Sequence, residues 1–267
     1  MKKQIKNKSL DLFKRSARYF LPSHKTSEKV FINTFPKSGT HLLKQIIEQF
    51  NPFKYRGVMV ADYSSLTGKR RKQKSLSSAI NNSKKNEILY GHIFYNEQIE
   101  KDLDSNNFKN ILLIRDLRNV VISEANWYTY MNKFNHMHNR FKSLSSDEER
   151  ISLCINGLED QNIYYPNIRE RFANYFGWLE SESVLKINYE NLIDKNRINL
   201  SISDIYEFCT GSKINESTLM KIKKGLNPQK SHTFNKKRSN YETTMTKRNL
   251  EDFEKIAGDL NRSLNYK

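Results

Sequence analysis

Short apolar runs alternate with segments of helical periodicity along most of the chain. Four of these runs have the length and the continuous hydrophobicity of strands that are buried on both faces. They are Val30-Phe31-Ile32, residues 87–91, residues 109–115 and residues 184–188. Short buried strands separated by helices are typical of a parallel sheet that is flanked by helices on both faces. We therefore predict an α/β fold, and the lack of an internal repeat or linker favours a single domain over residues 1–267.

Helical periodicity is clearest directly after the first of these runs. Residues 40–50 carry apolar side chains along one side, and Pro52 ends the segment. Further helical patterns cover residues 119–134, most of 147–176, 197–209, 214–224 and 247–264. This regular alternation supports the α/β prediction.

Residues 1–28 form a basic N-terminal extension. Apolar residues recur at helical spacing in residues 1–21, but Asp11, Lys14 and Arg15 interrupt the apolar core that a signal peptide would need. We interpret this segment as a helix that docks on its own domain. A helix on a membrane surface is the alternative, so peripheral membrane contact through the basic N-terminus stays open.

Residues 57–86 are a second basic segment. From residue 64 to residue 86 the chain is polar and contains few large apolar side chains, with basic residues clustered at 69–74. We expect a long, mobile surface loop here.

Composition narrows the class of protein. The hydrophobic share of 37% excludes a disordered polyelectrolyte, and no apolar run approaches the roughly 18–20 residues of a membrane span. Two cysteines, Cys154 and Cys209, are too few for a disulfide framework or a four-cysteine metal site, and they favour a reducing compartment. We expect a cytoplasmic protein and leave membrane association open.

The chain is strongly basic, with 46 Lys+Arg against 29 Asp+Glu and a formal charge of +17. Nucleic acid, a membrane surface, a phosphorylated small molecule and surface lysines without a function would each fit this excess. The charge by itself does not choose among them.

A candidate phosphate-binding loop, Phe35-Pro-Lys-Ser-Gly-Thr40, lies between a predicted strand and a predicted helix. The start of a helix offers unpaired backbone N–H groups and the positive end of the helix dipole. Gly39 permits close backbone approach to an anion, and Ser38 and Thr40 add hydroxyl donors. Lys37 supplies a mobile ammonium group. The lysine precedes the glycine, unlike the ATP-type loop G-x-x-x-x-G-K-[ST], and an ordinary turn capped by Ser or Thr is the alternative.

A second motif, Arg115-Asp-Leu-Arg-Asn-Val-Val-Ile-Ser123, begins where the third strand ends. Ligands of parallel sheets gather beyond the carboxyl ends of the strands, so Arg115 should lie on the same edge as Lys37. Ser123 follows Arg115 by eight positions, just over two helical turns, and its hydroxyl could reach the same anion. A surface pair of Arg115 with Asp116 and a serine merely tolerated in a helix are the alternatives.

Together the two motifs resemble the sulfotransferases that use 3′-phosphoadenylyl sulfate (PAPS), of the cytosolic type, over residues 29–266. The resemblance implies a P-loop-like phosphosulfate-binding loop in which Lys37, Ser38, Gly39 and Thr40 hold the 5′ side of PAPS. It implies that Arg115 and Ser123 bind the 3′-phosphate. PAPS would be the co-substrate, adenosine 3′,5′-bisphosphate (PAP) the product, and no metal would be required.

Further positions extend the resemblance. His92 follows the second strand, where the family places its catalytic histidine, and Tyr189 matches a tyrosine that helps to hold the adenine. Ser123 would also bond Lys37 and restrain it until the acceptor arrives. Residues 241–246 and Phe253 resemble the stretch before the last helix of the family.

The sequence also departs from the family pattern. Lys236, Lys237 and Arg238 are the nearest substitute for an Arg-Lys-Gly run that grips the 3′-phosphate. His41 stands where a tryptophan often stacks on the adenine, and we expect it to pack beside the cofactor. Tyr90 stands where many members have a lysine two residues before the histidine.

The expected chemistry is sulfuryl transfer to a hydroxyl or an amine, which needs a base at the acceptor and a cation at the leaving phosphate. His92 suits the base because the pKa of histidine ordinarily lies near 6.5, and Lys37 suits the cation. A structural histidine is the alternative for His92, and His41 is a rival base. His136 and His138 lack the neighbours of a zinc site, so we predict no metal ligands.

Two other functions compete with a PAPS-dependent sulfotransferase. A nucleotide-dependent phosphotransferase should carry the ATP-type loop and a carboxylate for magnesium. A non-catalytic nucleic-acid-binding module should carry a basic stripe with interleaved aromatic residues, whereas the basic residues here are spread along the chain. We therefore expect a small-molecule, lipid or carbohydrate acceptor and no nucleic acid, while the sequence identifies neither the acceptor nor the oligomeric state.

Overall fold

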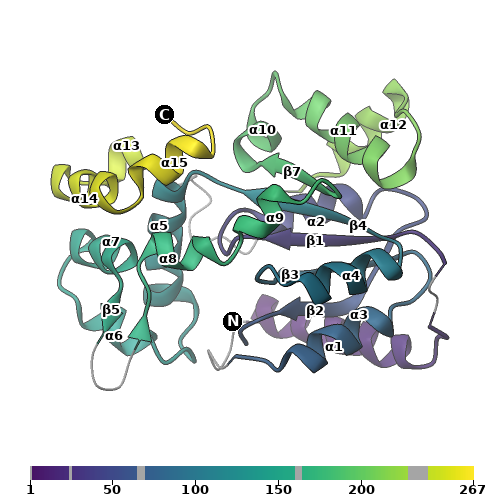
Figure 1. Cartoon of the computed structure of the whole chain (residues 1–267), viewed down its shortest axis with the longest axis horizontal. Helices are drawn as coiled ribbons and strands as arrows, with labels where there is room; N and C mark the ends of the chain where they lie inside the picture. The colour runs from purple at the N-terminus through teal and green to yellow at the C-terminus, as the bar shows by residue number, and fades with distance from the viewer. Residues whose placement is uncertain (1, 24–25, 65–69, 160–163, 228–239) are drawn as a thin grey trace.

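The computed structural model describes residues 2–23, 26–64, 70–159, 164–227 and 240–267, with side chains from residue 11 onward. Its centre is a five-stranded parallel sheet with the strand order β2-β3-β1-β4-β7 (Figure 1). The strands are β1 (Lys29–Thr34), β2 (Lys54–Ala61), β3 (Glu87–His92), β4 (Phe108–Ile114) and β7 (Val184–Asn188). The predicted single α/β domain with a parallel sheet is confirmed.

The central strand β1 shows why the sequence carries continuous apolar runs. Val30 and Ile32 pack into the core on one face of the sheet, and Phe31 packs into the core on the other. All three side chains are fully buried. Since both faces are covered, the middle of the strand is apolar on both faces, and the alternation typical of a half-exposed strand disappears there. The polar residues Lys29, Asn33 and Thr34 stand at the two ends of the strand and are buried as well.

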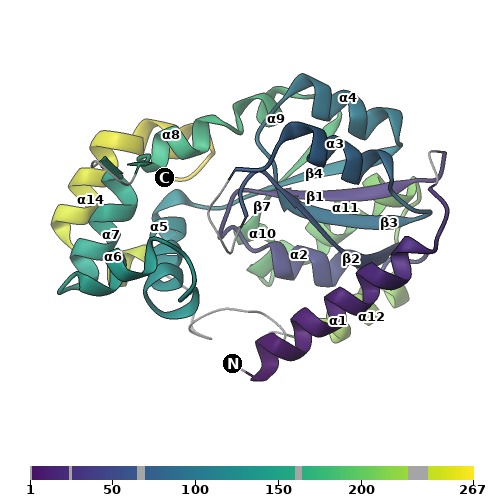
Figure 2. The same cartoon turned by 90° about the horizontal axis from the view of Figure 1, so that it is seen from below.

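Helices cover both faces of the sheet (Figure 2). One face packs against α2 (Thr40–Ile47), α10 (Tyr189–Ile193), α11 (Ile198–Thr210) and α12 (Glu216–Gly225). The other packs against α3 (Gln73–Asn81), α4 (Glu97–Ser105) and α9 (Phe176–Glu180). The basic helix α1 (Lys2–Tyr19) lies against the edge strand β2.

A group of helices lies beyond the carboxyl ends of the strands (Figure 1). It comprises α5 (Leu117–Asn126), the π-helix η1 (Trp127–Met131), α6 (His138–Ser143), α7 (Asp147–Asn156), α8 (Ile168–Ala173), α13 (Tyr241–Thr244), α14 (Lys247–Phe253), the π-helix η3 (Glu254–Gly258) and α15 (Asp259–Ser263). A short hairpin of β5 (Leu158–Glu159) and β6 (Tyr164–Tyr165) interrupts the helix predicted over 147–176. The apolar core of this group is continuous with that of the sheet, so it belongs to the same domain.

The prediction of a loop over residues 57–86 is wrong for most of these residues. Its first residues complete β2, which pairs with β3, and residues 73–81 form α3. Leu76 and Ile80 are buried beneath α3, and these two side chains, one helical turn apart, are enough to dock the helix. Residues 65–69 lie outside the described part of the chain.

The two cysteines, Cys154 and Cys209, are free and buried. Within the described residues, no helix is both long enough and apolar enough to cross a membrane. The N-terminal helix docks on the domain, as predicted, through contacts with β2.

Candidate active site

The carboxyl ends of three adjacent strands bring the predicted site residues to one edge of the sheet. Strand β1 ends at Thr34, β3 ends at His92, and β4 ends at Ile114, directly before Arg115. Because β1 pairs in parallel with both β3 and β4, the loops that follow these strands lie next to one another. The sheet therefore assembles residues that are almost 80 positions apart in the chain.

The loop between β1 and α2 has a backbone that few residue types adopt. Lys37 and Gly39 have φ angles of 69° and 105°, both in the left-handed region. That conformation is natural for glycine but strained for lysine. A strained residue that persists in a folded loop is typical of a functional site.

Two buried donors face this loop without a partner. The Oγ of Ser38 and the Nε of Arg115 form no hydrogen bond with the described residues, although both atoms are inaccessible to solvent. The Nη1 of Arg115 donates to the main-chain oxygen of Lys37 at 3.2 Å, which places the guanidinium directly against the loop. Buried polar groups are rarely left unsatisfied in native proteins, so these donors indicate a site that an anion completes.

Tyr189 packs against both motifs. A Cβ added at Gly39 would lie 2.4 Å from Cδ2 of Tyr189, so glycine is required for the ring to occupy this position. The guanidinium carbon of Arg115 lies 4.7 Å from the centre of the same ring. The structure thus joins the phosphate loop, Arg115 and Tyr189 into one cluster.

His92 is held in one tautomer. Its Nδ1 lies 2.8 Å from the main-chain oxygen of Thr34. A carbonyl oxygen can only accept, so Nδ1 carries the proton and Nε2 keeps its lone pair. Burial, together with the nearby charge of Lys37, lowers the pKa of His92 to about 4 despite the hydrogen bond to Thr34, so the ring is neutral at pH 7.

The hydroxyl of Thr34 ties His92 to the phosphate loop. Thr34 Oγ1 lies 2.9 Å from Nδ1 of His92 and 2.7 Å from Oγ1 of Thr40 at the start of α2. Both threonines are buried. The imidazole and the helix start are therefore positioned by the same side chain.

Lys37 lies among charged and aromatic groups from α5 and η1. The pKa of Lys37 is lowered to about 8, mainly by burial. The carboxylate of Glu124 opposes this shift, and the charge of Arg115 adds to it. The Nζ of Lys37 lies 5.4 Å from the centre of the Trp127 ring. Neither Glu124 nor Trp127 was singled out from the sequence, since only the fold brings α5 against the loop.

Comparison with known proteins identifies the family. Residues 27–258 match the sulfotransferase domain, which is more than half of the chain. The chain belongs to the PAPS-dependent sulfotransferase family. No curated protein matches it by sequence.

Solved structures agree on the fold of this sulfotransferase. The structure of mouse sulfotransferase SULT7A1 complexed with PAP is 16% identical, with a TM-score of 0.63 over 94% of this chain and 92% of that one. A retinol dehydratase in complex with androsterone and PAP is 14% identical, with a TM-score of 0.55 over 93% of this chain and 84% of that one. The retinol complex of retinol dehydratase with PAP gives 14% identity and a TM-score of 0.54, covering 93% and 85%. These likenesses show the shared fold.

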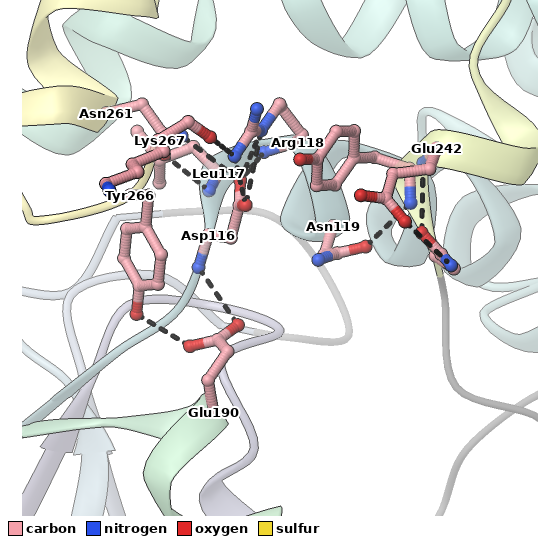
Figure 3. A network of polar contacts seen from close by, with 11 residues as sticks. Asp116, Leu117, Arg118, Asn119, Glu190, Glu242, Asn261, Tyr266 and Lys267 are labelled. Carbon is pink, nitrogen blue, oxygen red and sulfur yellow. Dashed lines mark hydrogen bonds and ion pairs between the residues drawn. The ribbon is translucent and has the colours of Figure 1, made fainter. Parts of the chain in front are cut away.

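A polar network supports the Arg115 segment of the sulfotransferase (Figure 3). The main-chain N–H of Asp116 donates to Glu190 Oε1 at 3.3 Å, and Tyr266 Oη donates to Glu190 Oε2 at 2.7 Å. Asn261 donates to Asp116 and accepts from the N–H of Leu117. These contacts join the end of β4 to α10 and to the C-terminal residues, and the sequence analysis did not predict them.

The structure describes two of the remaining predicted site residues, Ser123 and His41, and does not describe the other three. Ser123 lies half-buried in α5, one residue before Glu124, and His41 lies half-buried in the first turn of α2. Lys236, Lys237 and Arg238 lie outside the described residues. A groove of about 320 Å³ between α3, α4 and the end of β3 is lined by Asp62 and Arg70 among others, but not by His92 or Lys37.

Proposed function

We propose that this sulfotransferase moves the sulfuryl group of PAPS to an acceptor hydroxyl or amine and releases PAP. The observation that carries the proposal is the buried pair of unsatisfied donors, Ser38 Oγ and Arg115 Nε, beside the strained loop at Lys37. A nucleotide with phosphates at both ends of its ribose would supply the missing acceptor atoms. The neighbouring structures of SULT7A1 and of retinol dehydratase are complexes of those proteins with PAP.

The donor nucleotide would be held by two groups of residues. Lys37, Ser38, Gly39 and Thr40 would hold the 5′-phosphosulfate at the start of α2, where backbone N–H groups are available. Arg115 and Ser123 would hold the 3′-phosphate. Further contacts come from His41 and Tyr189 beside the adenine, and from Lys236, Lys237 and Arg238.

His92 would act as the general base. Its protonated Nδ1 is engaged by Thr34, so the free lone pair on Nε2 is the one that can accept a proton from the acceptor. The lowered pKa keeps the ring neutral and ready to act throughout the physiological range. As the oxygen of the acceptor forms its bond to sulfur, its proton passes to Nε2 of His92.

Lys37 would stabilise the leaving group. The bond between sulfur and the bridging phosphate oxygen breaks as the acceptor attacks, and negative charge accumulates on that oxygen. A buried ammonium beside it is worth more than one in water, because the surrounding dielectric is low. Ser123 would restrain Lys37 before the acceptor arrives. These steps require no metal ion.

The acceptor belongs to one of three classes: a small molecule, a lipid or a carbohydrate. Retinol dehydratase, the protein of two neighbouring structures, is in complex with androsterone in one of them and with retinol in the other. The family assignment favours sulfuryl transfer over the phosphotransferase alternative, and the absence of a nucleic-acid partner stays a prediction.

Radiolabelled PAPS and a panel of hydroxyl acceptors test the proposal. We expect labelled product with at least one acceptor, and a loss of turnover of about 100-fold or more in His92→Ala with PAP binding retained. Lys37→Ala should lose both turnover and most of the affinity for PAPS. Full turnover in His92→Ala would refute the base assignment, and unchanged PAPS affinity in Lys37→Ala would refute the role of the loop.

A further inference from the structure

The helix α1 packs on the domain through its charged side. Arg18 donates to the fully buried carboxylate of Glu87 at 2.6 Å, and Lys14 Nζ lies 5.3 Å from the centre of the Tyr55 ring. Gly57 of β2 approaches the helix so closely that a Cβ there would lie 2.4 Å from the main-chain oxygen of Asp11. The polar side of α1 is therefore the side that faces the sheet.

The apolar side of α1 faces solvent. Leu12 and Phe13 are 67% and 71% exposed, and Tyr19 and Phe20, at and just after the end of the helix, are 87% and 86% exposed. A helix that stabilises its own domain buries its apolar side, so the polarity of α1 is the reverse of that expected. Large exposed apolar side chains grouped on one segment typically mark a surface that is covered by a partner.

The charge of α1 indicates which partner covers it. Seven of its residues are basic and one, Asp11, is acidic. The basic residues are Lys2, Lys3, Lys6, Lys8, Lys14, Arg15 and Arg18. A second copy of the chain would bring the same basic helix and the same formal charge of +17, so pairing two copies through α1 would place like charges together. Lys14 and Arg18 contact the domain, but Arg15 is exposed. An anionic lipid surface complements the excess of basic residues on this helix and the exposed aromatic side chains.

We propose that α1 is a peripheral membrane-binding helix that inserts Leu12, Phe13, Tyr19 and Phe20 into the interface of an anionic bilayer. The docked polar side holds α1 against β2 on the outside of the molecule, where the helix runs obliquely to the strands (Figure 2). Since Arg18 contacts the start of β3 and Asp11 contacts the middle of β2, the N-terminal half of α1 extends toward the carboxyl ends of the strands. The bilayer would then lie beside the edge of the sheet that carries His92.

Vesicle sedimentation with the full chain and no nucleotide tests the proposal. The probes are phosphatidylcholine vesicles with and without phosphatidylserine, and the variant is Leu12→Ser/Phe13→Ser/Phe20→Ser. We expect the wild type to bind only the vesicles with phosphatidylserine, and the variant to bind them at least about tenfold more weakly. Leu200→Ser in α11 is the matched control because Leu200 is 68% exposed, and it should bind like the wild type.

Salt provides a second readout. Raising the ionic strength from about 0.1 M to about 1 M shortens the Debye length from about 10 Å to about 3 Å, and binding should fall with it. Equal binding to both kinds of vesicle, no binding to either, or equal binding of the triple variant and the wild type would each overturn the proposal. So would a dimer in light scattering that the triple variant dissociates, since α1 would then be covered by a second copy. Because no nucleotide is present, these results are independent of the sulfuryl transfer proposal.

Discussion

At the scale of single residues, the proposed chemistry depends on the protonation states of Lys37 and His92. Burial is the main cause of the lowered pKa of both groups, but the pKa of His92 lies below pH 7 and the pKa of Lys37 lies above it. His92, with a pKa of about 4, is neutral at pH 7, and Lys37, with a pKa of about 8, is still mostly charged. One environment therefore gives a base that can accept a proton and a cation that can stabilise a phosphate.

The pH dependence of kcat/KM for PAPS follows from these two values. The rate should fall as the pH drops through about 4, where His92 becomes protonated, and as it rises through about 8, where Lys37 of the free enzyme loses its charge. The alkaline limb of kcat should lie at higher pH, because bound donor phosphates favour the charged form of Lys37. An acidic limb near 6.5, the ordinary pKa of histidine, would contradict the buried, neutral His92.

Most of the candidate site residues could be named from the sequence because they belong to local motifs, and their roles stay predictions. Lys37, Ser38 and Gly39 are neighbours in sequence, and Arg115 follows a strand that the apolar pattern reveals. Glu124 and Trp127 could not be predicted, because their contact with Lys37 depends on how α5 and η1 pack against a loop some 90 residues earlier. No spacing rule encodes that packing.

At the scale of secondary-structure elements, the turn from β1 into α2 is the segment on which the geometry of the proposed donor site depends. Gly39 combines a positive φ with close contact to the Tyr189 ring, so its replacement should have two separate costs. Gly211, at the end of α11, also has a positive φ, of 68°, but no atom lies within 4 Å of a Cβ added there. A comparison of substitutions at the two glycines therefore separates the cost of backbone strain from the cost of a steric clash.

We predict that Gly39→Ala lowers the affinity for PAP at least about tenfold, since Tyr189 must move away from Arg115. Gly211→Ala should destabilise the fold by about 1 kcal/mol through strain alone and leave PAP affinity unchanged. Calorimetric titration with PAP and thermal denaturation of both variants check this. Wild-type affinity in Gly39→Ala would show that the position of Tyr189 does not matter to the donor.

The elements that the sequence failed to predict are those whose pattern is weak for a physical reason. Strand β2 lies at the edge of the sheet and contains Gly57 and a register shift between Tyr55 and Met59, so its apolar run is confined to residues 58–61 in the second half of the strand. Helix α3 is anchored by Leu76 and Ile80 alone among large side chains, which leaves most of its surface polar. The interior strands were predictable because burial on both faces gives each of them a continuous apolar run.

At the scale of the whole molecule, the basic residues behind the formal charge of +17 fall into groups with different proposed partners. Lys37 and Arg115 lie at the proposed donor site, whereas Lys14 and Arg18 of α1 contact the domain and Arg15 of α1 is exposed. The parallel sheet determines this division, because its carboxyl edge gathers the loops that we propose bind the nucleotide. At the same edge, hydrogen bonds join the residue Asp116 after β4 to Glu190, and Glu190 to Tyr266.

Titration of the purified chain with PAP is the most direct test of the central claim, because it needs no knowledge of the acceptor. The account predicts that PAP binds the wild type, that Arg115→Ala binds it at least about tenfold more weakly, and that His92→Ala binds it as the wild type does. Failure of the wild type to bind PAP, or equal affinity in Arg115→Ala, would contradict the assignment of this edge of the sheet as the PAPS site.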